Sequence, residues 1–458
     1  MQAVQLAALA DAPAGVAAAL DAVSGFDTAL VNGFARVSEP QSAALAVLSG
    51  AVAGSPLAEA VAAAVSKVST GAIGTDELSA LAAARAALLG AVHDALVDQA
   101  DAALGRNRSE WTDTLDAAAL SPLAAGSRAW LGELAIAGWL GVDHDLVAAA
   151  DQTVESLLAD PGLRRLATLL DGFSAELSAF APIATMDRVP ARRWADLWTR
   201  AMLLSWRGAE STVTESVSGR LLPLGVDLHE HGTAVQAQVH GVLEVAGAPA
   251  RRVRVSVAAA KVDTIVGPAV WQLLGAHRQL LTALAEQRAL ELTDMPLTAI
   301  GDLLWDDERA KAGEAADPFV TATVQLPQAQ APAVAPLDRD PVHIAEPVLL
   351  EGYRFRDGAM ELDEQRIRVE LDALPSAGPL TPAGVTASST MIGLLRWDAG
   401  GWSVRPLAVR RKVKSALTTF HNGNWALGPT DPKVAKVQTK SGDAVAVLRE
   451  RAGRLLRE

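Results

Sequence analysis

The chain of 458 residues contains no cysteine. Disulfides, thiolate zinc sites, iron–sulfur clusters held by cysteine and cysteine nucleophiles are therefore excluded. Aromatic residues are also scarce, at 4% of the chain, and only 8 of its 40 basic residues are lysine. The absence of disulfides fits a reducing compartment, and we take a cytoplasmic protein as the default expectation.

Long hydrophobic runs are missing too. Residues 1–20 have no basic segment before their apolar stretch and include Asp11, which is unlike a secretory signal. The most apolar window, residues 43–68, is rich in alanine and is interrupted by glycine, proline and glutamate. A membrane span needs roughly 20 strongly apolar residues, so the sequence predicts no span and no membrane partner.

Several catalytic motifs are absent as well. The sequence has no phosphate-binding Gly-Lys-Ser/Thr loop, no dinucleotide glycine fingerprint after a strand, no nucleophile-elbow serine and no His-Glu-x-x-His. Half of the residues are apolar and a fifth are charged, as in folded globular proteins. The length predicts more than one hydrophobic core.

Charge is distributed unevenly along the chain. Residues 396–458 contain 13 Lys or Arg against 5 Asp or Glu, a balance of +8, although the whole chain has a net charge of −13. The first 395 residues therefore have a balance of −21. This asymmetry of charge bears on which partners the protein binds, or on how its two ends contact each other, and does not predict the fold.

The first 212 residues have the periodicity of helices. The clearest helix runs from Thr75, a candidate N-cap, to about Gly105, with leucine and valine at helical spacing. Many of the apolar stripes are alanine, which allows close helix packing. Both a bundle and stacked helix pairs fit this pattern.

From about Ser218 the apolar period changes to alternation. Residues 219–228, 233–245 and 253–257 are expected to form half-buried strands of an antiparallel meander with one wet face, and Gly267-Pro268 to open a helix that runs to about Arg288. Further strands are expected at 348–355, 366–371, 391–397 and 402–409, followed by a C-terminal helix over 443–457.

These patterns predict an α+β fold, in which an all-α, alanine-rich region precedes antiparallel β-rich modules with interspersed helices. The expected divisions are an all-α region over 1–212, a β meander with helices over 213–326, a Pro/Ala/Gln linker or extended crossing over 327–341, and a β-rich basic module over 342–458.

The densest polar cluster is Asp227, His229, Glu230 and His231, with His240 on the next strand. Alternate residues of a strand share a face, so a carboxylate and two or three imidazoles could converge on a divalent metal. The spacing matches no established zinc signature, and an ordinary polar turn is the favoured alternative. Apart from this metal we predict no cofactor.

The sequence Asp143-His144-Asp145 resembles carboxylate pairs used in acid–base catalysis. It also lies where a helix should begin. Aspartate at the N-cap and in the first turn is favoured by the helix dipole, so helix capping is the preferred interpretation.

Two clusters of arginine and tryptophan are candidate partner-binding surfaces. On the helix that starts at Pro190 they are Arg192, Arg193 and Trp198. Trp198 lies one helical turn after Trp194, and such a Trp pair more often anchors a helix in its own core than in a partner. In the basic C-terminal region the candidates are Arg405, Arg410, Arg411, Lys412, Lys414, Trp402 and Trp425.

The leading functional hypothesis is a non-catalytic interaction or scaffold protein, a subunit of a larger bacterial-type cytoplasmic assembly with a protein partner. The first alternative is a nucleic-acid-binding protein, because basic residues interleaved with aromatic ones can bind a phosphate backbone and stack on bases. The second is a metal-dependent enzyme at Asp227, His229, His231 and His240. The oligomeric state stays open.

Overall fold

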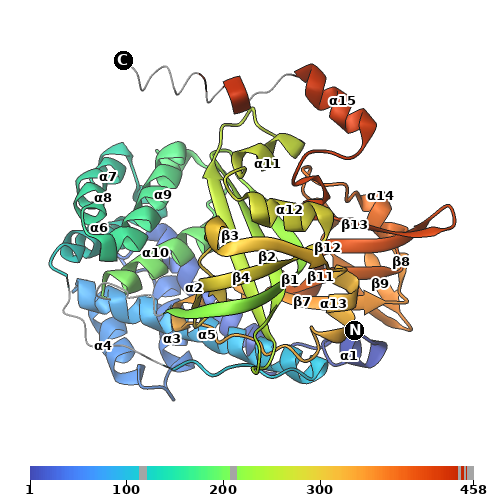
Figure 1. Cartoon of the computed structure of the whole chain (residues 1–458). Helices are drawn as coiled ribbons and strands as arrows, with labels where there is room; N and C mark the ends of the chain where they lie inside the picture. The colour runs from blue at the N-terminus through green and yellow to red at the C-terminus, as the bar shows by residue number, and fades with distance from the viewer. Residues whose placement is uncertain (113–120, 207–213, 442–444, 448–449, 451–458) are drawn as a thin grey trace.

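The computed structural model describes residues 1–112, 121–206, 214–441, 445–447 and 450. The predicted C-terminal helix over 443–457 lies mostly outside the described residues. An N-terminal helical region is followed by two β-sheets with interspersed helices, so the predicted α+β class is confirmed (Figure 1). The sheets are mixed, because β3 pairs with β5, and β10 with β12, in parallel.

The helices of the N-terminal region are α1 (Ala3–Ala7), α2 (Val16–Asn32), α3 (Glu39–Ala51), α4 (Ala58–Ser69), α5 (Thr75–Leu104), α6 (Ala124–Ala137), α7 (His144–Ala148), α8 (Asp151–Leu158), α9 (Arg164–Phe180) and α10 (Ala191–Ser205). The predicted helix from Thr75 is thus confirmed, although Gly74 rather than Thr75 is its N-cap. The later helices are α11 (Val270–Leu273), α12 (Arg278–Glu286), α13 (Pro318–Val324), α14 (Pro382–Thr386) and α15 (Pro432–Ser441).

The strands of the first sheet are β1 (Thr214–Glu230), β2 (Ala234–Glu244), β3 (Arg251–Ala260), β4 (Arg288–Thr298), β5 (Asp302–Leu303) and β6 (Ala310–Ala315). Their order is β1-β2-β3-β5-β4-β6, and β1 also pairs with β4, so the pairings close into a ring. The apolar face of β1, β2 and β3 packs against α11 and α12 in one core. The predicted single helix over 267–288 is interrupted, because α11 ends at Leu273 and α12 begins at Arg278.

The strands of the second sheet are β7 (Glu346–Glu351), β8 (Arg354–Arg356), β9 (Ala359–Leu362), β10 (Gln365–Val369), β11 (Thr390–Asp398), β12 (Gly401–Val413) and β13 (Ala416–His421). The order is β7-β11-β12-β10-β9-β8, and β13 pairs with β12. The predicted strand over 348–355 is divided at Gly352, whose φ of 73° turns the chain between β7 and β8.

Helix α5 joins the helical region to the second sheet. Its first half contributes Leu81 and Leu88 to the helical core, whereas Val92, Leu96 and Val97 pack into the core of the second sheet. By length and composition α5 could cross a membrane, but 56% of its most apolar window is buried inside the protein. Its hydrophobicity is therefore explained by the two cores that it serves.

The segment over 327–345 crosses between the two sheets in a largely extended form. Gln330 exchanges backbone hydrogen bonds with β3 and the residue before it, since Arg252 N donates to Gln330 O at 2.9 Å and Gln330 N donates to Ala250 O at 2.9 Å. Ala331 N donates to Asn107 O, just beyond α5, at 2.9 Å. The crossing is thus tied to the helical region and to the first sheet at one point.

Candidate functional site

The polar cluster on β1 and β2 occupies the non-core face of the first sheet. The antiparallel register places Gln238 opposite Asp227 and Gln236 opposite His229, while His240 lies opposite Gly225. Cross-strand partners share a face, so the structure brings Asp227, His229 and His240 to one side of the sheet, as alternation predicts.

The ion pairs of Asp227 define how this cluster is organised. His229 Nε2 lies 3.3 Å from Asp227 Oδ2, and Arg405 Nη1 donates to the same oxygen at 3.1 Å. Burial alone would raise the pKa of Asp227, but the hydrogen bond to His229 and the charge of Arg405 outweigh it and lower the pKa to about 2. Burial lowers the pKa of His240 to about 4. At neutral pH the cluster therefore holds a carboxylate that is already paired and a neutral imidazole.

The fourth predicted ligand, His231, lies apart from the other three. It is exposed beyond the end of β1, and its Nδ1 is 3.2 Å from Thr233 Oγ1. Within the described residues no group of three or more His, Asp or Glu side chains is arranged to hold a metal ion. The metal hypothesis gains no support from this geometry, and His231 has the contacts of a polar turn.

The Asp143-His144-Asp145 segment caps a helix. Asp143 is the N-cap of α7, and its Oδ1 accepts a hydrogen bond from Leu146 N at 2.9 Å. The capping interpretation is confirmed.

The arginine and tryptophan residues of α10 divide between core and surface. Trp198 is fully buried and its Nε1 donates to Leu131 O at 2.8 Å, so it anchors α10 in the helical core and offers no surface to a partner. Arg193 Nε contacts Glu176 at 2.7 Å, and Arg192 Nε lies 3.5 Å from Asp196. These arginines are partly exposed, but both pair with neighbouring helical carboxylates.

Most of the predicted basic C-terminal surface is used inside the molecule. Arg405 connects the two sheets, because it contacts Glu370 at 2.9 Å as well as Asp227. Trp402 packs edge-on against Trp397, with ring centroids 5.3 Å apart, and is 8% exposed. Trp402 Nε1 also donates to Gln99 Oε1 on α5 at 3.3 Å, so both residues help to join the second sheet to its neighbours.

The remaining candidates also make intramolecular contacts. Arg410 pairs with Asp317 and stacks over Phe319 at 4.4 Å, while Arg411 stacks over Phe420 at 4.5 Å. Trp425 is 8% exposed and belongs to the core of the first sheet. Lys412 and Lys414, by contrast, are both exposed.

These two lysines lie on a ribbon of two strands, defined as residues 411–418. The pairing of β11 with β12 ends at Arg410, whereas β12 and β13 continue to pair up to Val413 and Ala416. Lys414 occupies the turn with a φ of 58°. The ribbon therefore extends past the sheet, and within the described residues β13 has no strand on its other side (Figure 1).

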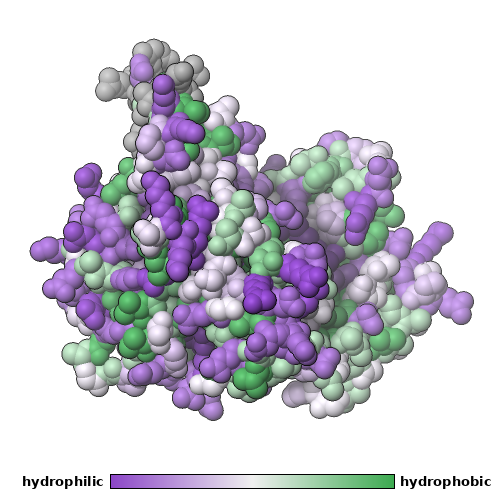
Figure 2. All heavy atoms as spheres, turned by 90° about the vertical axis from the view of Figure 1, so that its right-hand side faces the viewer, coloured by the Kyte–Doolittle hydropathy of each residue, from purple (hydrophilic) through white to green (hydrophobic). Residues whose placement is uncertain are grey.

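The ribbon also exposes apolar side chains. Leu417 is 61% exposed and Val413 is 40% exposed. Figure 2, which looks at this side of the molecule, shows apolar residues interspersed with many hydrophilic ones. The ribbon thus combines exposed hydrophobic area, lysine charge and an open strand edge.

None of the family models matches the chain, and no curated protein or solved structure is significantly similar to it.

The structure adds polar residues that the sequence pattern did not single out. Gln236 and Gln238 on β2 and Arg252 and Arg254 on β3 line a cleft on the same side of the sheet as His240. Their alternation was visible in the sequence, but it indicated only a wet face. The signal that could have found them is their chemistry, since arginine, histidine and glutamine side chains recur on one strand face.

Proposed function

We propose that this chain is a non-catalytic interaction protein of the cytoplasm, which binds an acidic protein partner through the ribbon of residues 411–418. The observation that carries the proposal is the exposure of Leu417 and Val413 beside Lys412 and Lys414. Apolar residues bordered by charge are typical of protein interfaces, where the apolar contacts supply affinity and the charges supply orientation.

The open edge of β13 supports one mode of binding. Backbone N–H and C=O groups of an edge strand can pair with an extended segment of another chain. Lys412 lies opposite Leu417 across the ribbon, so one face offers an apolar contact next to a positive charge. An acidic, extended segment with apolar residues at alternate positions fits this arrangement.

The contacts of the ribbon favour a protein partner over a nucleic acid. Stacking on bases needs exposed aromatic rings, but Trp402 and Trp425 are buried and Phe420 is covered by the guanidinium of Arg411. Among the described residues of the ribbon only Lys412 and Lys414 are exposed lysines, whereas binding to a phosphate backbone uses many cations. We therefore place the nucleic-acid alternative second.

The test is affinity purification of the full chain from its native cells, comparing wild type with a Lys412→Glu/Lys414→Glu variant. The expected result is a partner that elutes with wild type, is lost from the variant, and rebinds when purified. Because rim charges act through steering, we expect the association rate to fall by about tenfold or more and to depend on salt. Leu417→Ser should instead raise the dissociation rate.

A matched control changes the same charge elsewhere. Arg278→Glu/Lys311→Glu alters two exposed basic residues on α12 and β6, away from the ribbon. Retention of the partner by this control supports the proposal. Loss of the partner from both double variants, or from neither, contradicts it, and binding of a random single-stranded oligonucleotide that the ribbon variant abolishes would favour the nucleic-acid alternative.

A further inference from the structure

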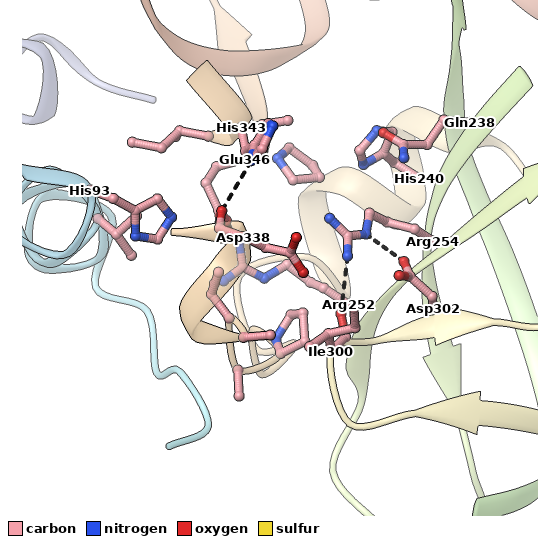
Figure 3. Close-up of a pocket in the computed structure, with 18 of the residues that line it drawn as sticks. His93, Gln238, His240, Arg252, Arg254, Ile300, Asp302, Asp338, His343 and Glu346 are labelled. Atoms are coloured by element: carbon pink, nitrogen blue, oxygen red, sulfur yellow. Dashed lines mark hydrogen bonds and ion pairs between the residues drawn. The ribbon is translucent and has the colours of Figure 1, made fainter. Parts of the chain in front are cut away.

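A cleft of about 650 Å³ lies between α5, the polar face of β2 and β3, and the crossing segment. This volume is in the range of small-molecule binding sites. Figure 3 shows the guanidinium of Arg254 pointing into the centre of the cleft and His93 facing it from the helix. Three parts of the chain that are distant in sequence therefore build one concave polar surface.

Positive charge predominates among the residues that line the cleft. They include five arginines against three carboxylates, in a chain whose net charge is −13. The arginines are Arg108, Arg200, Arg252, Arg254 and Arg396, and the carboxylates are Asp302, Asp338 and Glu346. A concave surface of one sign with low-dielectric walls concentrates ligands of the opposite sign.

The excess charge has a buried source at the base of the cleft. Arg108 contacts Glu346 at 2.8 Å and Asp101 at 2.7 Å. Arg252 also pairs with Glu346, and Arg106 Nη1 lies 3.8 Å from it. Among the described residues, three guanidiniums thus share two carboxylates in a buried cluster, an excess of one positive charge.

The pKa values of this cluster reflect the crowding of cations. Burial lowers the pKa of Arg106 to about 9, and repulsion from Arg252 acts in the same direction. Burial alone would raise the pKa of Glu346, but the surrounding guanidiniums of Arg252 and Arg108 outweigh it and hold that pKa far below its usual range. An additional anion near these groups would relieve the excess.

Two buried side chains that line the cleft have polar atoms without a hydrogen-bond partner among the described residues. Arg252, which is 4% exposed, uses Nη1 on Glu346; its Nε and Nη2 have no hydrogen-bond acceptor, although Nη2 lies 3.9 Å from Asp101 Oδ1. These two nitrogens form the edge of the guanidinium that binds a carboxylate or phosphate in two parallel hydrogen bonds. His240, 2% exposed, leaves Nε2 unpartnered.

These buried atoms are closed to solvent, so they affect a bound ligand mainly through the electrostatic field of the protein rather than by direct contact. The group that a ligand reaches directly is the guanidinium of Arg254, which is one-third exposed, at 33%, and pairs with Asp302 at 2.8 Å. Much of the remaining lining is apolar and comes largely from the crossing segment, with Pro332, Ala333 and Val334. The cleft therefore offers a cation at its centre and apolar surface beside it.

From this arrangement we propose that the cleft is a binding site for a small organic anion, whose carboxylate or phosphate group contacts Arg254 and whose apolar part lies against residues 332–334. Gln236 and Gln238 line the same cleft and offer neutral amide groups for further hydrogen bonds. The site is independent of the ribbon, because different residues form the two surfaces.

The experiment is isothermal titration of the full chain with two probes, inorganic phosphate and benzoate, at constant ionic strength. Saturable binding of either probe is expected, and the one that binds more tightly indicates which anionic group the site prefers. Benzyl alcohol, which has the same ring without the charge, should bind at least about tenfold more weakly than benzoate, since a hydrogen bond to a charged group is lost.

Three substitutions separate a binding role from a structural one. Arg254→Gln should weaken binding by about tenfold, and Asp302→Asn should tighten it, because the anion no longer competes with that carboxylate for Arg254. Arg220→Gln is the matched control, since Arg220 is a partly exposed arginine of the same sheet that pairs with Glu244 at 2.8 Å, and it should leave the affinity unchanged.

A general loss of structure would weaken anion binding in both variants, so opposite changes in affinity from Arg254→Gln and Asp302→Asn indicate a binding role. Circular dichroism of each variant confirms that it is folded. The proposal is overturned if neither phosphate nor benzoate binds saturably at millimolar concentration, or if both variants bind as wild type does.

Discussion

At the scale of single residues, the most consequential contacts form a triad of charged side chains that joins three helices. Arg85 on α5 is 1% exposed, and its Nε donates to Asp27 Oδ1 on α2 at 2.6 Å. Its Nη2 contacts Asp196 on α10 at 2.6 Å. Nothing in the sequence indicates this triad, because the partners are distant along the chain and no periodic pattern marks a buried charge.

Arg85→Met should destabilise the protein by about 3–5 kcal/mol, because it leaves the Asp27 carboxylate buried without its partner. The double variant Arg85→Met/Asp27→Leu should recover a large part of this loss, since neither charge then remains buried. Urea unfolding measures both free energies of unfolding. A double variant that is no more stable than Arg85→Met would show that packing of the arginine stem, rather than charge, is what matters.

A second residue-scale prediction concerns acid sensitivity. Burial lowers the pKa of His421 from 6.5 to about 4. Its backbone N–H donates to Asn424 Oδ1, so the amide Nδ2, 2.8 Å from His421 Nε2, can donate only to a neutral ring. Below pH 6.5 the unfolded chain binds a proton that the folded chain does not, so stability falls as pH is lowered from 6.5 towards 4.

The free energy of unfolding that is lost because His421 stays neutral reaches about 3 kcal/mol near pH 4. His421→Gln should reduce the slope of the free energy of unfolding against pH over the same range, which urea titrations at several pH values would measure. Asp227 affects stability in a different pH range. Folding lowers its pKa from 3.8 to about 2, so its contribution to the free energy of unfolding is complete above pH 3.8 and is lost as the pH falls towards 2. An unchanged slope in His421→Gln would contradict the assignment.

At the scale of elements, alternation predicted the strands well and their surroundings poorly. The pattern over 233–245 and 253–257 corresponds to β2 and β3, and the helix from Thr75 was found with nearly the right end. Alternation shows which residues share a face, but not what lies opposite that face. The face expected to be wet is instead the wall of a cleft, because α5 and the crossing segment come to lie in front of it.

Other elements escaped prediction for physical reasons. The strands β4 and β6 lack a clean alternation, and β5 has only two residues and is fixed by its pairing with β3 and β4. The metal hypothesis rested on spacing alone. Spacing did not reveal that Arg405, far away in sequence, neutralises Asp227, or that His231 lies beyond the strand.

The close approach of the two sheets gives an element-scale prediction. A Cβ added to Gly225 on β1 would lie 2.8 Å from Leu407 Cβ on β12. Gly225→Val should therefore push the sheets apart and cost about 1–3 kcal/mol of stability. Gly172→Ala on α9, where an added Cβ meets nothing within 4 Å, should be neutral or stabilising by up to about 1 kcal/mol. Thermal unfolding compares the two, and equal effects would contradict the close contact.

At the scale of the whole molecule, the helical region and the sheets are not independent. Helix α5 belongs to the core of the helical region and to the core of the second sheet, and the crossing segment is hydrogen-bonded to β3 and to residues just beyond α5. The cleft forms where these parts meet. The sequence predicts the helical region, the strands and the crossing segment separately. The cleft depends on contacts between residues more than 200 positions apart, such as Arg108 and Glu346, which no local pattern indicates.

The contrast between the acidic first 395 residues and the basic C-terminal region is likewise explained only by contacts across the whole molecule. Part of the basic C-terminal charge neutralises acidic residues that precede the second sheet, as Arg405 and Arg410 do with Asp227 on β1 and Asp317 at the start of α13. Lys412 and Lys414 are exposed on the ribbon, where we place the protein partner, and Lys433 and Lys436 are exposed on α15. The cleft is a separate, positively charged surface within an acidic protein.

The most direct test of this account is the phosphate or benzoate affinity of Arg254→Gln and Asp302→Asn measured against wild type in one titration series. A cleft that holds an anion on Arg254 predicts weaker binding in the first variant and tighter binding in the second, with Arg220→Gln unchanged. Equal affinities in all four proteins, or shifts of the same sign in both cleft variants, would contradict it.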